Sequence, residues 1–110
     1  MTWAEVREHL AVRFGADPIE IDGQTVDVVR AEVLGATWIQ VKSAIGPARG
    51  ASPTELLVGN LHLPIGAFCV EDGALALRQK LPLAAVRPRD LDEIIHAIAT
   101  QSARVKAQLR

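Results

Sequence analysis

The stretch that decides the fold is LPIGAFCVEDGALALRQKLPL, residues 63–83. A Leu-Pro pair stands near each end, and Glu71-Asp72-Gly73 separates two short apolar runs. Gly73 supplies the positive φ that a tight hairpin turn requires. The stretch therefore predicts a β-hairpin with strands over residues 65–70 and 74–81.

The second strand of this hairpin has two different sides, because successive side chains of a strand point to opposite faces. Leu75, Leu77 and Leu81 fall on one face. Arg78 and Lys80 fall on the other. The alternation predicts that the leucine face is turned toward the core and the cationic face away from it.

Helices are predicted on both sides of the hairpin. Residues 52–55, Ser-Pro-Thr-Glu, fit a capping box with Pro in the first turn, and they predict a helix that runs to about Leu61. Pro64 follows the end of that helix. The longest helix is predicted over residues 88–109. Its apolar face consists of Leu91, Ile94, Ile95, Ile98, Val105 and Leu109.

The chain begins with a further predicted helix, over residues 2–14. Thr2 and Glu5 fit a capping box, in which each side chain bonds the backbone N–H of the other residue. Gly15 then stops the helix. Trp3, Val6, Leu10 and Phe14 are spaced by three and four residues, so they form one apolar stripe.

Three strands are expected between this helix and residue 46, over residues 18–21, 24–34 and 37–45. Asp22-Gly23 and Gly35-Ala36 are the predicted turns between them. The alternation of the middle strand slips at Val28-Val29, which indicates either a β-bulge or a strand covered on both faces.

The predicted order of elements is α-β-β-β-α-β-β-α. Every connection between consecutive strands is short, so the strands should pair antiparallel. A chain of 110 residues corresponds to one domain, 1–110, with enough apolar residues for a single core. The predicted fold class is α+β, with an antiparallel five-stranded sheet and three helices.

Composition narrows the classes of function. The chain has 12 Lys and Arg against 13 Asp and Glu and no basic run, so nucleic acid is not expected as a partner. No apolar run approaches the roughly 20 residues of a membrane helix, and no signal peptide is visible. Cys69 is the only cysteine, which excludes an intrachain disulfide. These features favour a cytoplasmic protein without membrane contact.

The three histidines do not indicate a metal or catalytic site. His9, His62 and His96 belong to different helices or their ends, and none has a second His or Cys at metal-ligand spacing. We interpret each as a structural or surface residue. Two histidines within mutual reach in a deep pocket would instead favour an enzyme or a small-molecule binder.

The cysteine and the paired acids of the hairpin also have ordinary interpretations. Cys69 lies between Phe68 and Val70, which favours a small buried hydrophobe, although a nearby Arg78 would allow a reactive thiol. Glu71-Asp72 is interpreted as a turn facing solvent rather than a catalytic pair. We therefore predict no catalytic residue, no metal ligand and no cofactor.

Trp38 is the residue that points most directly to a function. If Ile39 and Val41 face the helices, then Trp38, Gln40 and Lys42 lie on the opposite side of the sheet. An outward Trp is typical of a protein-binding surface, so these three residues are the predicted partner-binding site. A shift in register would place Trp38 in the core instead.

The second helix carries more apolar residues than one stripe needs. Leu57, Val58 and Leu61 are in excess, and we expect them at a two-fold interface between identical chains. The prediction is a homodimer.

The order of elements, together with Asn60 to Phe68, the Asp72-Gly73 turn, Leu75 to Arg78 and Leu81-Pro82-Leu83, resembles the bacterial type III secretion chaperone-like superfamily. That superfamily includes the secretion chaperones and the YbjN-like proteins. The resemblance implies a twisted antiparallel five-stranded sheet with three helices, a homodimer, and no cofactor or chemistry. In the secretion chaperones an extended segment of an effector protein wraps around the dimer. This chain is nearly neutral, whereas those chaperones are strongly acidic.

Two functions follow as hypotheses. The first is a chaperone-like, non-catalytic homodimer that holds an extended segment of a partner protein. The alternative is a YbjN-like regulatory or structural dimer that handles no client. An enzyme or small-molecule binder ranks third.

Overall fold

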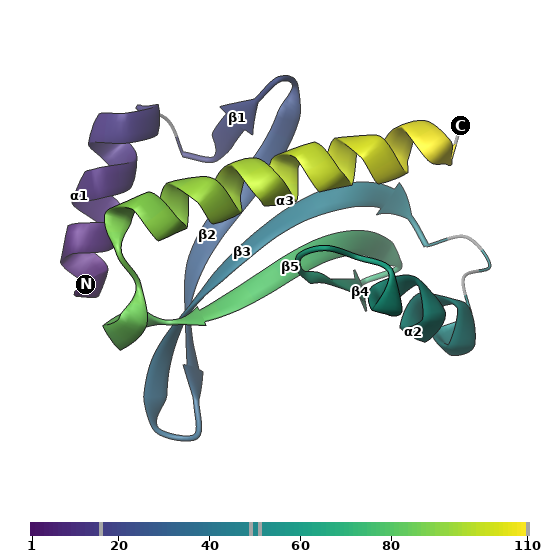
Figure 1. Ribbon diagram of the computed structural model, residues 1–110, viewed down its shortest axis with the longest axis horizontal. Helices are drawn as coiled ribbons and strands as arrows, with labels where there is room; N and C mark the ends of the chain where they lie inside the picture. The colour runs from purple at the N-terminus through teal and green to yellow at the C-terminus, as the bar shows by residue number, and fades with distance from the viewer. Residues whose placement is uncertain (16, 49, 51, 110) are drawn as a thin grey trace.

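Five antiparallel strands form one sheet in the order β1-β2-β3-β5-β4 (Figure 1). The computed structural model describes residues 1–15, 17–48, 50 and 52–109. The elements are α1 (Trp3–Phe14), β1 (Ile19–Ile21), β2 (Gln24–Val33), β3 (Ala36–Pro47), α2 (Pro53–Leu61), β4 (Ala67–Glu71), β5 (Ala74–Pro82), the 3₁₀ turn η1 (Leu83–Ala85) and α3 (Pro88–Gln108). The predicted α+β class and the order α-β-β-β-α-β-β-α are confirmed.

Capping residues mark the start of α1 and α2 and the end of α1. The Thr2 hydroxyl accepts the Glu5 backbone N–H at 3.1 Å, and the Glu5 carboxylate accepts the Thr2 N–H at 2.9 Å. Gly15 ends α1 in the left-handed region. The Ser52 hydroxyl accepts the Glu55 N–H at 3.1 Å at the start of α2. In the described parts of the chain, no helix is long and apolar enough to cross a membrane.

Tight two-residue turns close the hairpins at Asp22-Gly23, Leu34-Gly35 and Asp72-Gly73. Both central residues of each turn have a positive φ, the combination whose twist matches that of two antiparallel strands. The middle turn lies one residue earlier than the predicted Gly35-Ala36, because Ala36 already pairs with Val33. Leu34, at φ 53°, therefore takes a backbone conformation that is rare for Leu.

The irregularity of the sheet lies in β3 and not in β2. The register between β2 and β3 is continuous from Asp27 to Val33, so the predicted β-bulge or double cover at Val28-Val29 is wrong. Val28 is half-buried beside the core, whereas Val29 is exposed on the other face. The register instead shifts between Ala44 and Gly46, where β3 pairs with β5.

The core lies between the sheet and α3, which crosses β2, β3 and β5 (Figure 1). The strands contribute Ile39, Val41 and Leu77 among the fully buried side chains. The helix contributes Leu91, Ile95, Ile98, Ala99 and Ser102. Leu109, predicted as part of this face, is exposed, because it is the C-cap residue and the last turn projects away from the strands.

A small polar network stands inside this core. The Gln24 carboxamide donates to the Ser43 hydroxyl at 2.6 Å and to the Ala44 carbonyl at 2.7 Å. The Ser43 hydroxyl donates to the Thr25 carbonyl at 2.6 Å. The Ser102 hydroxyl is also buried, but it has no hydrogen-bond partner in the described chain. Ser102 is therefore a weak point of the core.

The connection from α2 to β4 depends on Gly66. Its φ is +76°, and a Cβ at this position would lie 3.0 Å from the Arg78 carbonyl oxygen and 3.0 Å from the Cδ1 atom of Ile98. Only glycine permits both the positive φ and this close approach. Gly66 thus lets the chain pass over β5 and α3 before β4 begins.

Candidate protein-interaction surfaces

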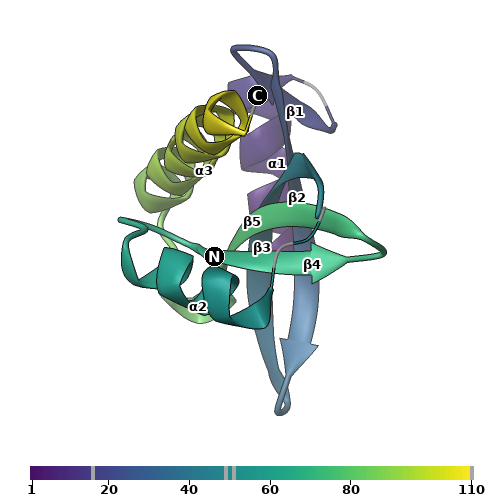
Figure 2. The same ribbon diagram turned by 90° about the vertical axis from the view of Figure 1, so that its right-hand side faces the viewer.

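One face of the sheet carries no helix among the described elements (Figure 2). Ile39 and Val41 are fully buried on the helix side, so Trp38, Gln40 and Lys42 point to the opposite side, as predicted. We call this the open sheet face. Its principal side chains are Val29, Trp38, Gln40, Lys42, Cys69, Glu71, Arg78 and Lys80.

Trp38 is half-buried on the open sheet face and is not part of the core cluster. The alternative prediction, a core Trp38 after a register shift, is therefore wrong. Trp38 pairs with Pro82 of β5 and Ala31 of β2. It borders a hollow of about 560 Å³ that Trp3 of α1 also lines. The start of α1 therefore lies near Trp38.

An ion cluster lies in the middle of the open sheet face. The Lys42 ammonium donates to a Glu71 carboxylate oxygen at 2.8 Å, and the Arg78 guanidinium lies 3.8 Å from the other oxygen. This hydrogen bond raises the pKa of Lys42 and lowers the pKa of Glu71. Asp72 is an exposed turn residue, as interpreted, and Glu71 is also exposed. The interpretation of Glu71 is corrected in one respect, because Glu71 is the last residue of β4 and reaches across β5 to Lys42.

Cys69 lies on the open sheet face and not in the core. It pairs with Ala76 of β5, and its side chain is half-buried. Burial raises the pKa of the thiol, and Arg78 lowers it by a smaller amount. The thiolate is therefore scarce at neutral pH, and Cys69 lacks the activation of a reactive cysteine. The predicted buried position of Cys69 is corrected to a half-buried one.

The second surface is the outward side of α2. Leu57, Val58 and Leu61 have 67%, 50% and 82% of their surface exposed, and α2 has no buried residue. The opposite side of the helix faces β4, where the Phe68 ring lies near Gly59. The Asn60 carboxamide oxygen accepts the Phe68 N–H at 2.6 Å. We call Leu57, Val58 and Leu61 the α2 apolar face.

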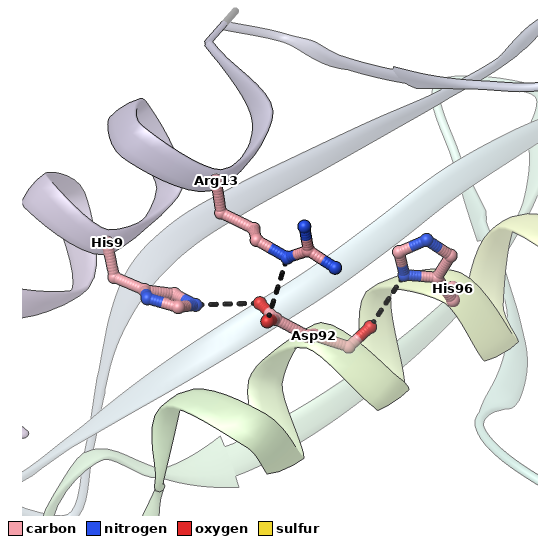
Figure 3. Close-up of polar contacts among 4 residues, drawn as sticks. All are labelled: His9, Arg13, Asp92 and His96. Atoms are coloured by element: carbon pink, nitrogen blue, oxygen red, sulfur yellow. Dashed lines mark hydrogen bonds and ion pairs between the residues drawn. The ribbon is translucent and has the colours of Figure 1, made fainter.

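A polar cluster joins α1 to α3 (Figure 3). One ring nitrogen of His9, Nε2, lies 2.7 Å from a carboxylate oxygen of Asp92, and the Arg13 Nε donates to the other oxygen at 3.3 Å. The His96 ring contacts the Asp92 backbone carbonyl at 2.9 Å. The Phe14 ring lies 5.9 Å from the His96 ring.

Two of the three histidines therefore meet at Asp92, which their sequence positions did not indicate. His62, the third, is the C-cap of α2 and lies apart from them. Within the described ranges, no group of three or more His, Cys, Asp or Glu side chains is arranged to hold a metal ion. His9 and Arg13 both bind the one carboxylate of Asp92, an arrangement that fixes α1 against α3.

No protein-family model matches the sequence. No curated protein matches it either.

Proposed function

We propose that the chain is a non-catalytic protein-binding module of the cytoplasm, which works as a homodimer and holds an extended segment of a partner protein. The observation that carries the proposal is the α2 apolar face, which lies in solvent on a helix without a buried residue. Helices at the surface of a globular protein normally turn their apolar side inward. An apolar side turned outward is typical of a protein interface.

A two-fold interface through α2 would bury each of these side chains in both copies of the chain. Complete burial of a Leu side chain contributes about 1.5–3 kcal/mol. Leu57 is two-thirds exposed, so its loss at both copies would cost the dimer about 2–4 kcal/mol. The change Leu57→Ser is therefore expected to weaken the dimer roughly a hundredfold.

The partner segment is assigned to the open sheet face. Trp38 is a half-buried aromatic side chain of β3, and Val29 adds exposed apolar surface on the neighbouring strand β2. Gln40 pairs with Val29 on one side and with Lys80 of β5 on the other, and both Gln40 and Lys80 supply hydrogen-bonding groups. Trp is among the residues that contribute most to protein binding.

The edge of the sheet at β4 is less suited to this segment. The Phe68 N–H points away from β5 and already donates to Asn60 of α2. An added strand at this edge would first have to break that hydrogen bond. No such hydrogen bond has to be broken on the open sheet face, so a segment lying across the strands is favoured over strand addition.

One observation favours the alternative of a regulatory or structural dimer without a client. The Lys42 ammonium is bound to Glu71, so the open sheet face has fewer available charges than its sequence indicates. A dimer that uses only the α2 apolar face would leave this ion cluster undisturbed.

The dimer is tested by sedimentation equilibrium on the wild type, Leu57→Ser and Val12→Ser. Val12 is the matched control, because it is 83% exposed on α1, away from α2. We expect a dissociation constant about a hundredfold higher for Leu57→Ser and an unchanged value for Val12→Ser. Equal effects of the two changes would contradict an interface at α2.

The partner segment is tested by affinity capture from host extract with the wild type, Trp38→Ser and Leu34→Ser. Leu34 is the control, since it is fully exposed at the tip of the β2–β3 hairpin. A protein captured by the wild type and Leu34→Ser but lost with Trp38→Ser supports binding at the open sheet face. Capture that Trp38→Ser does not change places the partner elsewhere, and a dimer that captures no protein favours the alternative.

A further inference from the structure

A groove of about 560 Å³ lies on the helix side of the molecule, between α3 and the end of β5. Most of its lining is apolar, with Ile65, Leu81, Val86 and Ile94 among the side chains. Asp90 and Glu93 of α3 are its only charged lining residues in the described chain. We call it the α3–η1 groove. None of its lining residues belongs to the α2 apolar face or the open sheet face.

The two acids stand on one wall of the groove. Asp90, Glu93 and Ile94 are spaced by three and four residues, so they share one side of α3. Three residues of helix correspond to about 4.5 Å along the axis, which places the carboxylates one turn apart. The wall therefore presents two negative charges directly above an apolar floor.

Neither carboxylate is strongly bound within the molecule. Asp90 is half-buried and has no ion pair or side-chain hydrogen bond in the part of the chain that the structure describes. Glu93 contacts only the Arg89 guanidinium there, at 3.8 Å, and both side chains are mostly exposed. An exposed ion pair of this kind contributes little to stability, so both carboxylates can bind a cationic group of another molecule.

An occupant of the apolar floor would cover Asp90 and remove it from water. Burial of a charge without a partner is unfavourable, so a purely apolar or acidic occupant is disfavoured. We propose that the α3–η1 groove binds a basic, apolar segment of a partner protein, with an apolar side chain on the floor and Lys or Arg against Asp90 and Glu93. This surface is additional to the two used in the proposed function and depends on neither.

The test is a titration followed by amide chemical shifts in two-dimensional NMR. Three acetylated and amidated peptides are the probes: Lys-Leu-Lys-Leu-Lys, Glu-Leu-Glu-Leu-Glu and Lys-Ser-Lys-Ser-Lys. We expect the first peptide to shift the amides of Val86, Ile94 and Ala97, and the other two to bind at least tenfold more weakly. Equal binding by the acidic or the serine peptide, or shifts confined to other surfaces, would overturn the proposal.

Variants of the groove distinguish the contribution of its charges to peptide binding from the contribution of its shape. Glu93→Gln combined with Asp90→Asn should weaken the first peptide about 3–10-fold, as expected for two exposed ion pairs. Ala97→Leu should fill the groove and abolish binding while it leaves both charges in place. Glu8→Gln on α1 is the control and should change nothing. Thermal unfolding verifies the fold of each variant, and Glu93→Gln alone still tests the charge if Asp90→Asn destabilises the first turn of α3. Unchanged affinity in every folded groove variant refutes the site.

Discussion

Replacement of Gly66 by Ala is predicted to destabilise the protein far more than the same replacement at Gly73. Both glycines have a φ of +76°, so an added Cβ meets the same backbone strain at the two positions. Their surroundings differ. At Gly66 the Cβ would lie 3.0 Å from the Arg78 carbonyl oxygen and from Ile98 Cδ1, whereas at Gly73 no atom lies within 4 Å. Comparison of the two variants therefore separates the energetic cost of close packing from the cost of the backbone conformation.

The expected magnitudes follow from these two contributions. The left-handed conformation costs Ala about 1–2 kcal/mol, and the loss of unfolded-state freedom returns about 0.4–1 kcal/mol. Gly73→Ala should therefore lose about 0–1.6 kcal/mol. Gly66→Ala adds overpacking against a backbone carbonyl and the core, about 1–3 kcal/mol more.

Urea unfolding monitored by Trp fluorescence measures both variants under one set of conditions. We expect the free energy of unfolding of Gly66→Ala to lie about 1–3 kcal/mol below that of Gly73→Ala, with similar m-values. Equal losses would show that the connection between α2 and β4 does not pass as close to β5 and α3 as described. A larger loss at Gly73 would show that close packing around Gly66 does not determine the cost of an added Cβ.

Three further predictions concern single side chains. Ser102→Ala should raise the free energy of unfolding in urea by roughly 1 kcal/mol, because it removes a buried hydroxyl without a partner; a comparable loss would show that the hydroxyl is bonded. Because the Lys42 hydrogen bond lowers the pKa of Glu71 below 4.5, it stabilises the fold above that pH, and the stabilisation is lost as the pH falls through the folded pKa. Melting temperatures of the wild type and Glu71→Gln should therefore differ near neutral pH and converge in acid, and a constant difference would contradict the ion pair. His9→Ala should increase amide hydrogen exchange along α1 by the equivalent of about 1 kcal/mol, whereas an effect equal to that of His62→Ala would rule out a specific role for the contact with Asp92.

The elements of the fold were predictable because their signals are local. The capping box at Thr2 and the Ser52 cap mark helix starts within four residues of sequence. The Asp-Gly pairs at residues 22–23 and 72–73 specify hairpin turns in the same way. The Leu34-Gly35 turn was misplaced by one residue, because Leu is an unusual residue at a positive φ.

The surfaces were predictable only where one face of an element is clearly apolar. Ile39 and Val41 fix the inward side of β3, so Trp38 could be assigned outward. In β4 both neighbours of Cys69 are apolar, and alternation gives no direction there. The pairing of β4 with β5 shows to which face Cys69 points, because it places Cys69 beside Ala76.

Contacts between distant residues were not predictable from one sequence. The Lys42–Glu71 pair spans 29 residues, and its formation depends on the register of three strands. His9 and Asp92 are 83 residues apart and meet only because α1 packs against α3. Hydrophobic periodicity contains no information about which polar side chains meet across such packing.

If the chains associate through the α2 apolar face, the molar mass of the wild-type protein in solution must be that of a dimer. Static light scattering behind a sizing column, over a range of loaded concentrations, measures that mass. We expect 23.6 kDa at micromolar concentration, twice the 11.8 kDa of one chain. A mass of 11.8 kDa that does not rise with concentration would contradict this association.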